Sequence, residues 1–235
     1  MADTDELSRA LAEESLRAAE TVERNRLELK QLVEQDHIEK EMNLLREFDS
    51  CWAELQKINK GLIELAVENS NIKASTLSFS QGTQAINRFK RSLGQIIANS
   101  VSSPQYSPIL KLACDALSAG FEIHYLHAPH IAAANDKDMD KIEGEITQLN
   151  EVIRNSMKEM ERYLPADQAL LQEADSAYSD FGRVTAEVIR LSRQNTNIKS
   201  FELSLGRKRK VTAQCDETLA SLLENVRSRT FEATR

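Results

Sequence analysis

The chain has 235 residues, of which 29% are charged, 5% are aromatic, 7 are glycine and 4 are proline. A β-rich or α/β protein of this length would need many more turn residues, and the regular recurrence of apolar residues excludes a disordered chain. The net charge of −7 argues against a broad nucleic-acid-binding surface. We therefore expect an all-α protein that binds no nucleic acid.

Apolar periodicity and turn residues predict five helices. In chain order they cover about 4–35, 39–100, 108–133, 136–163 and 166–231. The only clear long turn is the segment 102–108, which is rich in serine and proline, and Pro165 favours a helix start. No run of 18 or more apolar residues interrupts this series, so we expect no membrane span within the chain.

An internal repeat organises these helices. After a shift of 126 residues, segment 44–100 aligns with 170–226 without a gap, and 15 of the 57 pairs are identical. The repeat predicts two helical hairpins, 1–100 and 101–235, which together form one domain. The counterpart of segment 108–126 would lie before residue 1, so we expect the first hairpin to begin part way up its ascending arm.

Each long helix passes an asparagine-rich centre, at Asn69 in the first hairpin and at Asn195 in the second. Apolar residues alternate four and three apart on both sides of each asparagine, and a turn normally resets that phase. We expect two continuous helices, each about 90 Å long. The alternative is a turn at Asn-Ser/Thr-Asn. Two such hairpins side by side predict two four-helix bundles stacked end to end.

The pattern around Phe48, Asp49 and Trp52, running into Leu65 and Asn69, resembles the four-helix-bundle sensing domains of bacterial chemoreceptors and sensor histidine kinases. Segments 190–197 and 203–209 look like the last helix of such a domain before its second membrane span. The doubled hairpin is similar to the helical bimodular class of these sensors.

This resemblance implies a periplasmic domain of a signal transducer of the bacterial inner membrane, in two-component signalling or chemotaxis. Flanking transmembrane helices outside this sequence would anchor it. The domain would bind a small organic or aromatic acid between helices, relay a helix shift to the membrane, and act as a homodimer. Histidine kinase and chemoreceptor both remain open.

Seven residues are candidates for ligand binding, because they are polar, cationic or aromatic and lie on or beside the apolar seams. They are Asn69, Lys73, Arg88, His124, Tyr125, Asn195 and Lys199. A seam asparagine can instead fix helix register. His124 continues the stripe Ala113, Leu117, Phe121 and is therefore either a core histidine or a donor to a carboxylate. Trp52 and Tyr178, which the repeat matches, are expected in the core.

Enzyme motifs such as G-x-S-x-G, H-E-x-x-H and the P-loop do not occur, so we expect no catalytic residues in this chain. The resemblance implies a histidine kinase as one candidate for its parent protein. His124, His127 and His130 have no acidic or cysteine partner at useful spacing, so we expect no metal and no cofactor. Cys51, Cys114 and Cys215 are each expected to be small buried residues.

Two other hypotheses stay open. The chain is alternatively a soluble cytosolic helical-bundle scaffold that binds partner helices, which predicts stop codons rather than apolar spans beside it in the gene. A four-helix metal or redox protein would need inward Glu-x-x-His pairs. The one such spacing, from Glu34 to His37, has no counterpart in the other copy.

Overall fold

The computed structural model describes residues 5–164 and 168–233, and over these residues the protein is helical throughout, with no strand. The all-α expectation is confirmed. No helix within the described ranges is both long enough and apolar enough to cross a membrane.

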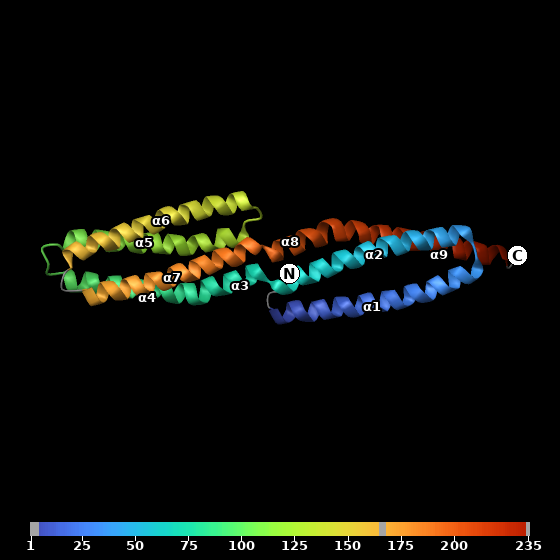
Figure 1. Ribbon diagram of the computed structural model, residues 1–235, viewed down its shortest axis with the longest axis horizontal. Coiled ribbons are helices and arrows are strands. Elements are labelled where there is room, and N and C mark those ends of the chain that lie inside the picture. The colour runs from blue at the N-terminus through green and yellow to red at the C-terminus, as the bar shows by residue number, and fades with distance from the viewer. Residues whose placement is uncertain (1–4, 165–167, 234–235) are drawn as a thin grey trace. The chain divides into compact units, whose positions relative to one another are not determined.

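The helices follow the expected order (Figure 1). They are α1 (Asp5–Asp36), α2 (Glu39–Glu68), α3 (Ser70–Leu77), the π-helical turn η1 (Ser78–Gly82), α4 (Thr83–Ser100), α5 (Tyr106–Ala132), α6 (Asp136–Tyr163), α7 (Gln168–Gln194), α8 (Thr196–Leu203), the π-helical turn η2 (Ser204–Lys208) and α9 (Arg209–Ala233). Most ends lie within two residues of those expected from the sequence. The expected start of the last helix at residue 166, and Pro165, fall outside the described residues.

The two long helical runs are confirmed, but each is interrupted by one residue. Asn69 and Asn195 have left-handed backbone conformations, with φ of 51° and 55°, and a new helix begins at the next residue. The expectation of an uninterrupted helix is therefore wrong at these two positions. Asparagine tolerates this conformation better than other side chains, because its short polar group can hydrogen-bond locally.

The left-handed asparagines and the π-helical turns occur at matched positions of the repeat. Asn69 and Asn195 are 126 residues apart, and so are the starts of the two π-helical turns, at Ser78 and Ser204. A π-helical turn inside an α-helix is rare. Two such turns at matched positions therefore show that the sequence duplication is also a duplication of local structure.

The chain divides into two compact units, and both divisions fall directly after a left-handed asparagine. Unit 1 comprises residues 1–69 and 196–235, and unit 2 comprises 70–195. Each unit therefore takes helices from both predicted hairpins. Among the described residues, unit 2 has four helical arms (α3–η1–α4, α5, α6 and α7), whereas unit 1 has three (α1, α2 and α8–η2–α9).

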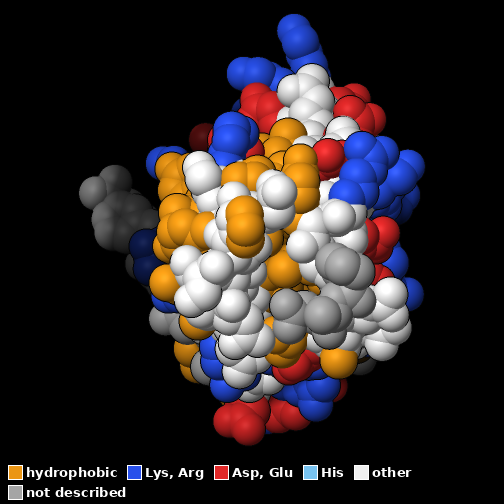
Figure 2. Space-filling model, turned by 90° about the vertical axis from the view of Figure 1, so that its left-hand side faces the viewer, with side chains coloured by type: hydrophobic (Ala, Val, Ile, Leu, Met, Phe, Trp, Pro, Cys, Tyr) orange, Lys and Arg blue, Asp and Glu red, His pale blue; other side chains and the backbone are white. Residues whose placement is uncertain are grey.

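Unit 2 has a continuous apolar core in which Phe89, Leu93 and Ile96 of α4 are completely buried. Gly120 of α5 permits close approach to α4, since a Cβ atom added there would lie 2.8 Å from the side chain of Ile86. At the connection from α4 to α5, apolar side chains reach the surface between charged ones (Figure 2), and Val101 there is 61% exposed.

Unit 1 has smaller, separate apolar clusters. The largest surrounds Phe48 and Trp52 of α2 and includes Cys51 and, from α9, Cys215. Cys114 of α5 is exposed, so its expected burial is wrong, whereas the burial of the other two cysteines is confirmed.

The matched aromatic residues Trp52 and Tyr178 pack in the two units in the same way. The indole of Trp52 donates to Glu23 of α1 (2.7 Å), and the hydroxyl of Tyr178 donates to Asn150 of α6. Their expected place in the core is confirmed. Because Glu23 and Asn150 occupy neighbouring positions under the 126-residue shift, α1 corresponds to α6.

Candidate ligand sites

The seam asparagines are fully engaged within their own units. The side-chain amide of Asn69 donates to Asp5 (2.9 Å) and Ser8 (2.8 Å) of α1, and its oxygen accepts from Asn197 (2.9 Å). Asn69 is 0% exposed. Its side chain therefore ties the broken helix to α1 and α8, which is the structural alternative considered for this position.

Asn195 repeats this arrangement in unit 2. Its amide donates to the carbonyl of Ala133 (3.0 Å), and its oxygen accepts from Asn71 (2.9 Å), which also donates to the carbonyl of Ile131 (2.9 Å). Buried amides in such networks rigidify a core when every group has a partner. These contacts account for the repeated asparagines without a bound molecule.

A column of histidines on α5 forms the polar interior of unit 2. His127 is 1% exposed, and its two ring nitrogens contact the hydroxyl groups of Ser78 (2.8 Å) and Thr185 (3.1 Å). Burial, with the nearby His124 and His130, lowers the pKa of His127 to about 4. The ring is therefore neutral near pH 7 and links α5 to η1 and α7.

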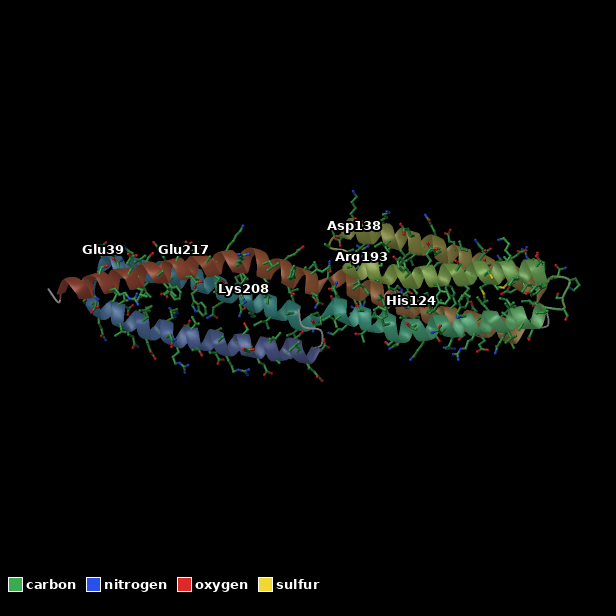
Figure 3. All side chains as sticks on the ribbon, turned by 180° about the vertical axis from the view of Figure 1, so that it is seen from behind. Glu39, His124, Asp138, Arg193, Lys208 and Glu217 are labelled. Carbon is green, nitrogen blue, oxygen red and sulfur yellow. The ribbon has the colours of Figure 1, made fainter. Side chains whose placement is uncertain are left out.

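His130, one turn further along α5, is 0% exposed. Its Nδ1 contacts Ser192 (2.8 Å) and its Nε2 contacts Glu143 of α6 (2.9 Å). Burial acts to raise the pKa of Glu143, but hydrogen bonds from Arg193 and His130 outweigh it and hold the pKa below its ordinary value. Arg193, which is labelled in Figure 3, also pairs with Asp140. This network joins three helices at one end of unit 2.

His124 and Tyr125 line a largely apolar hollow of unit 2. It has a volume of ≈ 470 Å³ and lies between α3–η1 and α5. Its walls are largely apolar and include Phe79 and Phe121, and Tyr125 is 74% exposed. The ring of His124, labelled in Figure 3, contacts the carbonyl of Ser78 within the π-helical turn through Nε2 (3.1 Å).

The remaining cationic candidates do not join this hollow. Arg88 forms an ion pair with Asp180 (2.6 Å) in a second hollow, where Arg183 and Glu187 keep the charges balanced. Lys73 is half-buried on α3, and Lys199 is exposed on α8. The structure thus brings together His124 and Tyr125 and leaves the other five candidates apart from them.

Several interior residues were not among the sequence candidates. They are Ser78, His127, His130, Glu143, Thr185 and Arg193. The signal was present in the chain, because buried residues of α5 are spaced mostly three or four apart. They include Ile109, Ala113, Ala116, Ile123, His127 and His130. The chosen stripe through Leu117 and Phe121 instead follows the edge of the helix, and Phe121 is 39% exposed.

No group of three or more histidine, cysteine, aspartate or glutamate side chains suited to a metal ion occurs in the part of the chain that the structure describes. Comparison with known proteins adds no relative: no protein-family model matches the chain, and neither a curated protein nor a solved structure is significantly similar to it.

Proposed function

We propose that this chain is a ligand-sensing domain of a transmembrane bacterial signal transducer, in the periplasm, and that the hollow beside η1 binds a small aromatic acid. The observation that carries this proposal is the hollow itself, with aromatic rings at Phe79, Phe121 and Tyr125 around the half-buried His124. Apolar walls with a few polar groups are typical of small-molecule sites.

An aromatic acid fits this chemistry better than an aliphatic one. A ring would stack or pack edge-on against the three aromatic side chains. The hydroxyl groups of Ser75 and Tyr125, which line the same hollow, would donate to the carboxylate. The cationic residues Lys73, Arg88 and Lys199 do not line it, so a polycarboxylic acid would lack charge partners there.

The position next to a π-helical turn suggests how binding would be relayed. η1 contains one extra residue per turn relative to an α-helix, and the ring of His124 contacts its backbone at Ser78. A ligand that binds one arrangement of η1 and α5 better than another would shift the population toward it. The proposal includes the end-to-end stacking of the two bundles expected from the repeat, a homodimer, and a signal carried by α9 to a following membrane helix.

A thermal-shift and calorimetric screen tests the ligand site. Benzoate and phenylacetate are expected to raise the melting temperature of the full chain, whereas citrate is not, because a bound ligand stabilises the folded state by mass action. Tyr125→Ala and Phe121→Ala should each abolish the shift. Phe201→Ala, which removes a half-exposed aromatic ring in unit 1, should leave it unchanged. Absence of any shift across aromatic and aliphatic acids would refute the ligand site.

The gene tests the membrane half of the proposal separately. Apolar spans encoded on both sides of this segment are expected for a transducer. Stop codons directly beside the segment would favour the alternative, a soluble helical scaffold that binds partner helices.

A further inference from the structure

Unit 1 holds two cysteines at one contact between helices. Cys51 of α2 and Cys215 of α9 are each 4% exposed and belong to the same apolar cluster, around Phe48 and Trp52. The helices α2 and α9 pack against each other. The cluster therefore contains a pair of buried thiols, whereas the third cysteine, Cys114, is exposed on α5 in unit 2.

The two sulfur atoms are in contact. The thiol of Cys51 donates to the carbonyl of Phe48 (3.2 Å), so its sulfur is free to accept a hydrogen bond. A hydrogen bond joins the side chains of Cys51 and Cys215. Burial is the main cause that raises the pKa of Cys215 to about 12, and this contact adds to it. Sulfur atoms in contact need only a small movement to reach the S–S bond length of about 2 Å.

The repeat shows that this contact is particular to unit 1. A shift of 126 residues matches Cys51 to Ala177 of α7. The same shift matches Cys215 to Phe89 of α4. Both counterparts are completely buried in the core of unit 2, where α4 packs against α7. One pair of positions therefore holds a large ring and a methyl group in unit 2 but two thiols in unit 1. Packing requires apolar bulk at these positions, and it does not require sulfur at both.

We propose that Cys51 and Cys215 are a redox site, and that they form a reversible disulfide by exchange with a small-molecule disulfide such as oxidised glutathione. One cysteine thiolate attacks the external disulfide, which gives a mixed disulfide and releases one small thiol. The thiolate of the other cysteine then attacks the protein sulfur of the mixed disulfide and releases the second small thiol. The two cysteines lose two electrons and two protons in total, and the external disulfide takes them up.

Burial governs the rate of this exchange. The thiolate is the nucleophile, and the raised pKa of Cys215 keeps its thiolate scarce near pH 7. Exchange therefore proceeds through transient separation of α2 from α9, or while the chain folds. The disulfide has no group that ionises, and it closes a chain loop that contains all of unit 2, which restricts the unfolded state. This inference does not depend on the ligand site or the location proposed above.

Refolding in a glutathione buffer provides the test. The full chain with Cys114→Ser is unfolded in urea with dithiothreitol and refolded with oxidised and reduced glutathione, and a second sample is incubated in the same buffer without urea. We expect mass spectrometry to show the loss of two hydrogen atoms, and a non-reducing digest to join the peptides that contain Cys51 and Cys215. The disulfide should raise the melting temperature by about 5 °C or more, and dithiothreitol should reverse both changes.

The matched control moves one thiol by a single residue. Cys215→Ala with Gln214→Cys, in the same Cys114→Ser chain, keeps the number of thiols but places one of them on an exposed face of α9. Successive residues of a helix point about 100° apart, so this chain should form no internal cross-link. Helical circular dichroism verifies that both chains are folded.

Three results would overturn the proposal. One is a folded chain in which Cys51 and Cys215 stay free or carry only glutathione. Another is a cross-link of equal yield in the control, because loose helices rather than the observed contact would then bring the thiols together. The third is a disulfide that lowers the melting temperature, because the native packing of α2 on α9 would then be incompatible with it.

Discussion

Units 1 and 2 contain matched helices but reach different degrees of closure. Unit 2 surrounds completely buried residues such as Phe89, Ile109 and Met160 with four helical arms. Within the described residues, unit 1 has three arms, small separate clusters and a row of half-exposed leucines on α1. The comparison shows that matched helices of one repeat can contribute to one continuous core or to several small clusters.

Each unit also holds polar side chains in or beside its core. In unit 2 the interior polar residues are histidines and hydroxyls held by α5, as at His127. In unit 1, Arg26 pairs with Glu23 and Asp49 beside the Trp52 cluster. The hydrogen bonds from Arg26 and Trp52 lower the pKa of Glu23 to about 2. Unit 2 holds a comparable cluster, since Arg193 pairs with Glu143 beside the buried His130.

The largest effect is expected from matched truncations in the two cores. Phe89→Ala should lower the free energy of unfolding of unit 2 by about 3–5 kcal/mol, because it removes a fully buried ring and leaves a cavity. Its repeat counterpart, Cys215→Ala in unit 1, should cost about 1 kcal/mol, since a much smaller side chain is lost. Hydrogen exchange followed by mass spectrometry resolves the two units.

The exposed Phe79→Ala is the control in the same unit and should change the exchange of unit 2 very little. Equal losses for Phe89→Ala and Cys215→Ala would contradict the expectation that the buried ring of Phe89 stabilises its core more than the smaller side chain of Cys215 does.

The next effect depends on pH and on His127. Because the folded-state pKa of about 4 lies below the unfolded value of 6.5, the unfolded chain binds the proton first as pH falls. The contribution of His127 is complete above pH 6.5 and is lost toward pH 4. Between pH 7 and pH 5 we expect unit 2 to lose about 2 kcal/mol, measured by urea unfolding.

His127→Gln should remove this loss, because glutamine does not titrate. His37→Asn, at an exposed position with a positive φ, should retain it. The carboxylates with lowered pKa values, Glu23 and Glu143, act below about pH 4.5 and do not enter this window. A pH dependence that persists in His127→Gln would exclude His127 as its source.

A smaller effect is expected at the left-handed asparagines. Asn69→Ala should destabilise unit 1 by about 2 kcal/mol, because alanine strains the backbone and the bonds to Asp5, Ser8 and Asn197 are lost. Asn69→Gly loses the same bonds but not the strain, so it should be about 1 kcal/mol more stable than Asn69→Ala. Unfolding in urea, followed by the fluorescence of the single tryptophan, Trp52, measures both.

The same pair of substitutions at Asn195 is the internal replicate in unit 2. If alanine and glycine were equivalent at both positions, the left-handed conformation would not be what the asparagines provide.

Helix content, order and most helix ends were predictable from the sequence, because they follow from apolar spacing and from very few breakers. The interruptions at Asn69 and Asn195 were not, because one left-handed residue changes φ and ψ locally and leaves the apolar phase nearly intact. A matched asparagine at both centres was nevertheless the available signal, since asparagine tolerates the left-handed conformation better than most residues.

The candidate site was predictable only in part. Two adjacent residues, His124 and Tyr125, line one hollow, but their partners Phe79 and Ser75 come from a segment some 50 residues earlier. Their proximity depends on how α3–η1 packs against α5, which spacing along one helix does not specify.

Thiol labelling compares the accessibility of the two units without changing the sequence. Cys114 in unit 2 is exposed on α5, whereas Cys51 and Cys215 are buried in unit 1. Burial and the neighbouring Cys51 raise the pKa of Cys215 to about 12, so almost no reactive thiolate forms near pH 8. With a thiol reagent in native buffer we expect one fast reaction, at Cys114, and two slow ones.

Urea should make all three cysteines react at similar rates, and Cys114→Ser should remove the fast phase alone. Fast labelling of Cys51 or Cys215 in native buffer would mean that unit 1 opens readily.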